Sequence, residues 1–124
     1  MQTCVLFCRL VKLVYERVNY LQLIQWSYAK RYQVKAIFDE FPDMILIFRT
    51  VGSYYFVFTT VGTVRHSYPS RKDYVEMELL INEQLQTLPA YIQRKSESEM
   101  IWVESWLREK GLSFTQLKVL PYKQ

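Results

Sequence analysis

The chain has 124 residues, half of them hydrophobic, which is enough for one domain with its own core and too little for several. Only 3 Gly and 4 Pro are present, and this excludes a collagen-like or linker-rich chain. Basic residues outnumber acidic ones by 16 to 12, so the net charge of +4 permits a phosphate-bearing partner without requiring one. We expect a single domain over residues 1–124.

The N-terminal residues suggest a compartment. Cys4 and Cys8 are four residues apart, a spacing that disfavours a disulfide and suits two buried thiols in a reducing cell. Arg9 and Lys12 interrupt the apolar residues around them, and no stretch approaches the ~20 apolar residues that a membrane span needs. We therefore expect a cytoplasmic protein that has no membrane partner.

A long N-terminal helix is predicted from about Cys4 to Arg31, because apolar residues recur there at steps of three and four without Gly or Pro. Such a helix is about 40 Å long at ~1.5 Å per residue, which is long for a body of this size. We expect it to pair two subunits of a homodimer. The residues predicted to form the paired face are Phe7, Leu10, Val14, Leu21, Ile24 and Tyr28.

The period then changes to that of β-strands. Val34–Phe38, Met44–Phe48 and Tyr54–Val61 are rich in β-branched and aromatic residues, and turn-forming residues separate them. Met44–Phe48 is apolar throughout, so we expect a central strand buried on both faces. Gly62 predicts either a bulge or a turn into a fourth strand over Thr63–Tyr68.

The C-terminal half predicts two further helices and a last strand. Ser70 followed by Asp73, and Ser96 followed by Glu99, have the spacing of helix N-caps. The first helix ends or kinks at Pro89, and Phe114–Leu120 has the composition of a strand. The predicted fold is therefore α+β with a three- to four-stranded, mostly antiparallel sheet, in the order αβββ(β)ααβ.

Catalytic motifs are missing from the sequence. His66 is the only histidine, and no nucleophile elbow surrounds a serine. The three glycines stand apart from one another, so no glycine-rich phosphate loop can form. We predict no catalytic residues, no metal site and no cofactor, and thus a protein that is not an enzyme.

One resemblance points to an alternative. The order of a helix, three strands, a helix and a strand is similar to the core of PD-(D/E)XK nucleases, with Asp43 where that family's first acidic residue sits and Glu16 on the leading helix. The third strand, Tyr54–Thr60, lacks the Glu/Asp-x-Lys of the family and carries no charge. The resemblance therefore implies at most a degenerate nuclease-like domain.

The most informative segment runs from a predicted strand into the N-terminus of a helix. Free backbone N–H groups and the helix dipole favour an anion at such a place. The predicted anion-binding residues are Arg65, His66, Ser70, Arg71 and Lys72, with Lys30, Arg31 and Lys35 as an extension. Solvated charges are the ordinary alternative for a basic loop.

The sequence thus predicts a small non-enzymatic interaction or regulatory protein. Its expected partner is an acidic one, with a nucleic-acid backbone favoured over an acidic protein surface. An inhibitor or regulator that binds another protein is the alternative. The aromatic run from Tyr54 to Phe58 is either a stacking platform for bases or ordinary core.

Overall fold

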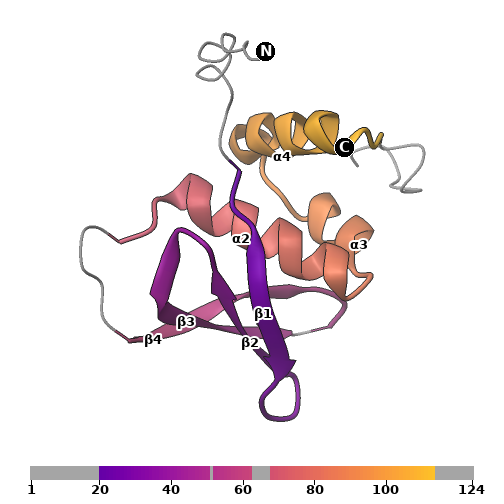
Figure 1. Ribbon diagram of the computed structural model, residues 1–124. Coiled ribbons are helices and arrows are strands. Elements are labelled where there is room, and N and C mark those ends of the chain that lie inside the picture. The colour runs from indigo at the N-terminus through magenta and orange to yellow at the C-terminus, as the bar shows by residue number, and fades with distance from the viewer. Residues whose placement is uncertain (1–19, 51, 63–67, 114–124) are drawn as a thin grey trace, which may run out of the picture.

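A computed structural model describes residues 20–50, 52–62 and 68–113. These residues form an α+β fold in which four strands precede three helices (Figure 1). The strands are β1 (Leu23–Tyr28), β2 (Gln33–Phe38), β3 (Phe41–Thr50) and β4 (Tyr55–Gly62), and the helices are α2 (Arg71–Gln84), α3 (Leu88–Gln93) and α4 (Glu97–Lys110). The predicted α+β class is confirmed, while the predicted order of elements is not.

The sheet is an antiparallel meander in the order β1-β2-β3-β4. The three strands predicted from composition are confirmed as β2, β3 and β4. The fourth strand of the described sheet is β1, which precedes the other three. The strand predicted over Thr63–Tyr68 and the one over Phe114–Leu120 lie almost wholly outside the described residues.

The predicted helix from Cys4 to Arg31 is wrong in its C-terminal part, because residues 23–28 form β1. Leu21 is buried at 2% exposure, whereas Ile24 and Tyr28 are 58% and 65% exposed, so the three do not share one helix face. Hydrogen bonding to β2 outweighs the helical spacing of the apolar residues. Phe7, Leu10 and Val14 lie outside the described residues, and the pairing of subunits stays a prediction.

Helices α2 and α4 begin where the sequence predicts. Ser70 is the N-cap of α2: its hydroxyl accepts a hydrogen bond from the Asp73 N–H, and the Asp73 carboxylate accepts one from the Ser70 N–H. The prediction of a single helix from Ser70 to Pro89 is wrong, because α2 ends at Gln84 and Pro89 lies in the first turn of α3. Gln86 interrupts the helix with a left-handed φ of 64°.

Two hydrophobic clusters hold the layers together. The first joins the sheet to α2 and contains Phe38, Leu46, Phe48 and Met77, all fully buried. The second joins the three helices around Trp106, which is 1% exposed. Leu80 borders both clusters, so α2 is the layer between the sheet and the other helices. Among the described helices, none has the length and apolarity needed to cross a membrane.

Candidate functional site

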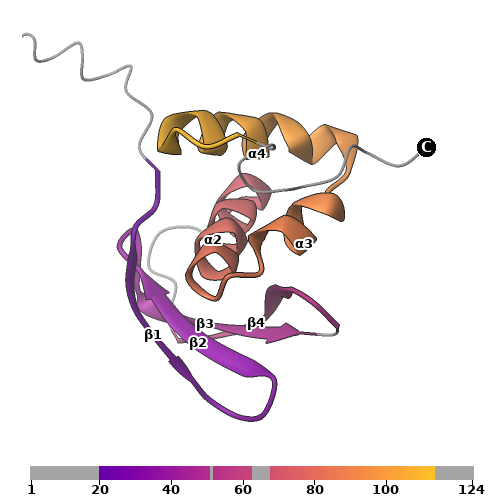
Figure 2. The same ribbon diagram turned by 90° about the vertical axis from the view of Figure 1, so that its right-hand side faces the viewer.

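One face of the sheet carries no helix of the described chain. Figure 2 shows all three helices on the same side of the sheet. Met44, Leu46 and Phe48 point toward α2 and are buried, whereas Ile45 and Ile47 between them are only partly buried. The prediction that this strand is buried on both faces is therefore wrong, because the second face has no layer against it in the described part of the chain.

The strand register brings cations and aromatic rings together on this open face. Arg49 of β3 lies opposite Gln33 of β2 and opposite Phe56 of β4. Lys35 lies opposite Ile47, one step along the sheet, which makes it a diagonal neighbour of Arg49 at about 7–8 Å. A register shift between Ile47 and Phe48 bulges β4 at Phe58, and such bulges re-aim side chains.

Two of these cations lie over aromatic rings. The Arg49 guanidinium carbon is 4.5 Å from the centroid of the Phe58 ring, and that of Arg31 is 5.0 Å from the Tyr32 ring. Phe58 and Tyr32 are 50% and 59% exposed, although burying an aromatic ring lowers the free energy of the folded protein. We call this set the basic–aromatic patch; its members are Lys30, Arg31, Tyr32, Lys35, Arg49, Phe56 and Phe58.

The turn between β1 and β2 carries part of the basic–aromatic patch in a constrained backbone. Tyr32 has a left-handed φ of 66°, which is rare for a bulky residue and costs about 1–2 kcal/mol. Its carbonyl accepts a hydrogen bond from the Thr50 N–H at 3.2 Å, and the Gln33 N–H donates to the Lys30 carbonyl at 2.9 Å. These bonds hold the exposed Tyr32 ring in place at the end of the sheet, near Arg49.

The charges of the sheet are separated along its strands. Lys30, Arg31, Lys35 and Arg49 form no ion pair with any described carboxylate. The sheet's own carboxylates, Asp39, Glu40 and Asp43, belong to the connection at the other end of β2 and to the start of β3. Burial, and then the neighbouring charges of Asp39 and Asp73, raises the pKa of Glu40. One end of the sheet is thus basic and the other acidic.

The structure describes only part of the predicted basic loop. Arg65 and His66 lie outside the described residues. The Ser70 hydroxyl is engaged in the cap of α2. Arg71 pairs with Glu99 at 3.0 Å and Lys72 with Glu76 at 3.7 Å, so glutamates of the chain itself already face both side chains.

The predicted extension of this loop, which consists of Lys30, Arg31 and Lys35, lies elsewhere in the structure. Lys30 and Arg31 lie in the β1–β2 turn, at the lower end of Figure 1, whereas the N-terminus of α2 lies at the left. The structure therefore does not bring the two groups of predicted residues together. It instead places Lys35 diagonal to Arg49 on the sheet, with Phe56 and Phe58 of β4 next to Arg49, and leaves Lys30 and Arg31 in the turn that leads into β2.

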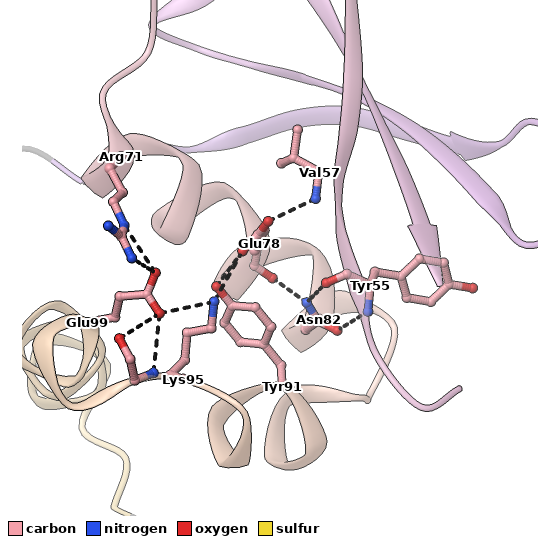
Figure 3. A network of polar contacts seen from close by, with 9 residues as sticks. Tyr55, Val57, Arg71, Glu78, Asn82, Tyr91, Lys95 and Glu99 are labelled. Atoms are coloured by element: carbon pink, nitrogen blue, oxygen red, sulfur yellow. Dashed lines mark hydrogen bonds and ion pairs between the residues drawn. The ribbon is translucent and has the colours of Figure 1, made fainter. Parts of the chain in front are cut away.

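A polar network on the helix side has a structural role (Figure 3). The Glu78 carboxylate accepts hydrogen bonds from the Val57 N–H at 2.8 Å and from the Tyr91 hydroxyl at 2.6 Å. Burial, and then the Glu78 charge, raises the pKa of Tyr91, so this phenol stays protonated and donates. The network ties α2 to β4 and α3, and its polar groups are occupied by one another.

The outer part of the same network joins α3 to α4 and to the start of α2. Lys95 lies 3.8 Å from the Glu78 carboxylate and 3.5 Å from that of Glu99, with its ammonium over the Tyr91 ring. Burial alone would raise the pKa of Glu99, but its hydrogen bonds from Arg71 and Ser96 and the charge of Lys95 outweigh this and lower it. These contacts fix the helices relative to one another.

A metal centre is not formed by the described residues, which contain no group of three or more His, Cys, Asp or Glu placed to hold an ion. Glu16, one of the two carboxylates of the nuclease resemblance, lies outside them. β4, the strand in the position of the motif, carries no charged residue.

Arg49 and Tyr32 are the members of the basic–aromatic patch that sequence reasoning missed, and for Arg49 the sequence held a clue. A signal was present, because Ile45, Ile47 and Arg49 alternate along one face of a strand, and a charged residue there indicates that this face meets solvent. The run Met44–Phe48 concealed the alternation, since every residue in it is apolar. The pairing of Arg49 with Phe58 depends on the bulge in β4, for which the sequence gives no clear signal.

Comparison with known proteins gives one match. The model of a protein family described as "Uncharacterised protein YuzH" matches residues 22–96. This region contains the whole described sheet, α2 and α3. No curated protein and no solved structure matches the chain.

Proposed function

The chain belongs to the YuzH family, whose model covers more than half of it, and we propose a function for it. The proposed function is that of a non-enzymatic protein that binds single-stranded nucleic acid through the basic–aromatic patch. One observation carries the proposal. Lys35 and Arg49, which pair with no described carboxylate, lie together with the half-exposed ring of Phe58 on a sheet face that no described helix covers.

The chemistry of the basic–aromatic patch suits a single strand better than a duplex. Cations that follow a backbone, with rings on which unpaired bases stack, are the two features shared by proteins that bind single strands without sequence preference. Phe58 offers a half-exposed ring with the Arg49 guanidinium over it, and Lys35 supplies a further positive charge on β2, the strand on the other side of β3. In a duplex the bases are stacked on one another, and the rings would gain nothing.

The distribution of charge on the sheet favours an acidic polymer as the partner. The exposed rings and the cations occupy the same end of the sheet, and the carboxylates of the sheet lie at the other end. A strand of phosphates would therefore lie across the basic end, in contact with Lys30, Arg31, Lys35 and Arg49. Arg65 and His66 stay predicted as further contacts.

The proposal is tested by fluorescence anisotropy of labelled oligothymidylate titrated with the protein at several salt concentrations. Affinity should fall steeply with salt, and a Lys35→Ala/Arg49→Ala variant should lower the slope of log K against log salt by about 0.7 for each lost phosphate contact. Phe58→Ala should weaken binding by about 1–3 kcal/mol with the slope unchanged, since stacking releases no counterion.

The matched control is Arg71→Ala/Lys72→Ala, which removes the same number of charges from side chains that already pair with Glu99 and Glu76. It should leave both the affinity and the slope close to those of the unaltered protein. The proposal is wrong if single strands do not bind at low salt, or if the control weakens binding as much as the sheet variant does.

A further inference from the structure

The open face of the sheet contains a shallow hollow of about 120 Å³ beside the basic–aromatic patch. Ile37 and Ile45, both partly buried, form its apolar floor, and the exposed side chains of Gln25, Ser27 and Lys35 stand around it. Lys35 also belongs to the basic–aromatic patch. A strand that contacts Lys35 in the patch is therefore next to the hollow as well.

The strand pairing produces this hollow. Gln25 lies opposite Ile37 and Ser27 opposite Lys35, so two polar residues of the edge strand β1 flank the residues of β2. A register shift between Leu23 and Gln25 displaces β1 locally, and such an irregularity re-aims the side chains next to it. The result is a flat apolar floor with hydrogen-bonding groups along one side.

The polar groups of the hollow are available to a ligand. Gln25 and Ser27 are exposed, and no hydrogen bond within the described chain engages the Gln25 amide or the Ser27 hydroxyl. A glutamine amide offers a donor and an acceptor side by side, and a hydroxyl offers either. This combination, over an apolar floor, matches a flat heteroaromatic ring with polar atoms on its edge.

We infer that the hollow receives one unstacked base of the bound strand and that Gln25 gives it a preference for adenine. Glutamine pairs with adenine through two hydrogen bonds, donating to N7 and accepting from the N6 amino group. Ile37 and Ile45 pack against the face of the base, and Lys35 contacts the adjoining phosphate. The inference rests on the proposed function, to which it adds a base preference at one position.

The test compares three labelled oligothymidylates of about 12 nucleotides, a length within the site sizes of such surfaces. They differ only at the central nucleotide, which carries thymine, adenine or cytosine. The strand with adenine should bind about fivefold tighter or more, the lower end of what one bidentate side-chain contact discriminates. Gln25→Leu should abolish this difference and retain the binding of all three strands.

A second variant reverses the preference. Gln25→Glu replaces the donor by an acceptor, so adenine loses its N7 partner while the amino group of cytosine still finds an acceptor. The added negative charge weakens all three strands alike, and the ratio of affinities within the variant should now favour cytosine. Gln33→Leu is the matched control, because this amide lies opposite Arg49 and outside the hollow; it should keep the adenine preference.

The outcomes separate the two proposals. Equal binding of the three strands by the unaltered protein, or an adenine preference that survives Gln25→Leu, overturns the base-binding hollow and leaves the proposed function standing. Failure of all three strands to bind at low salt overturns the proposed function, and the hollow with it. Thermal unfolding of each variant shows whether it is folded, and Gln25 is exposed on an edge strand where substitutions are tolerated.

Discussion

At the scale of single residues, the Asn82 side chain is hydrogen-bonded to two separate parts of the chain. It is fully buried, and it bonds the backbone of β4 on the side where the described sheet has no further strand. Its amide oxygen accepts from the Tyr55 N–H at 2.9 Å, and its amide nitrogen donates to the Tyr55 carbonyl at 2.9 Å. The same side chain also bonds the Thr87 hydroxyl, which fixes the connection to α3.

Replacing Asn82 by leucine keeps the branching and the number of side-chain heavy atoms and removes these bonds. The two backbone groups of Tyr55 lose their partner, and each buried unsatisfied group costs about 1–3 kcal/mol. We expect a loss of about 3 kcal/mol in the free energy of unfolding, measured by urea denaturation. Gln84→Leu, an exposed amide on the same helix, should change it by less than about 0.5 kcal/mol. Equal stability of the two variants would contradict the role given to Asn82.

Residues differ in how well the sequence predicts them. The capping residues Ser70 and Ser96 are predicted correctly, because a cap depends on residues three positions apart. Asn82 is not predicted, because its partners Tyr55 and Thr87 are brought to it by the sheet and by a turn. Arg71 and Lys72 have the composition of an anion site, and only the fold shows that Glu99 and Glu76 face them.

At the scale of elements, the two edges of the sheet are different. The edge of β4 is covered by Asn82 and Glu78 of α2, which engage backbone groups of Tyr55 and Val57. Covering an edge in this way prevents it from pairing with another chain. At the other edge, β1 places Gln25 and Ser27 beside the hollow, and this is the edge that the proposed ligand approaches.

Gly62 marks a close approach between the backbones of β3 and β4 at the end of their pairing. It lies opposite Met44 with a φ of +122°, and a Cβ added here would overlap the carbonyl oxygen of Asp43. Gly62→Ala should therefore lower the melting temperature and cost about 1–3 kcal/mol, the range for a strained backbone.

Gly52→Ala is the matched comparison for that variant. Its φ is also left-handed, at +95°, but nothing lies within 4 Å of the added carbon. It should destabilise less than Gly62→Ala, because only the backbone strain remains. A Gly62→Ala protein as stable as the Gly52→Ala protein would contradict the close approach of β3 and β4.

Among the elements, β2, β3 and β4 are predictable because β-branched and aromatic residues dominate them. β1 is not, since Leu21, Ile24 and Tyr28 also fit the spacing of a helix and the choice depends on pairing with β2. The division between α2 and α3 depends on the left-handed Gln86, a residue type that gives no warning of this conformation. Local patterns therefore predict elements only where long-range pairing does not compete with them.

At the scale of the whole molecule, charge is distributed between the two layers. Several cations of the helical layer meet carboxylates, as in the pairs Arg71–Glu99, Lys95–Glu78 and Lys110–Glu83. Those of the sheet do not, and they gather with exposed rings at one end of it. From composition an acidic partner is no more than a possibility, because the excess of basic residues is small and its location depends on the fold.

The most direct test of the account follows backbone amide resonances in ¹H–¹⁵N spectra while unlabelled oligothymidylate is added. The largest shifts should lie at Lys35, Ile47, Arg49, Phe56 and Phe58, on the open face of the sheet, with α4 and the first turn of α2 unaffected. Shifts concentrated on the helices, or unchanged spectra at low salt, would contradict the claim that this sheet face binds a single strand.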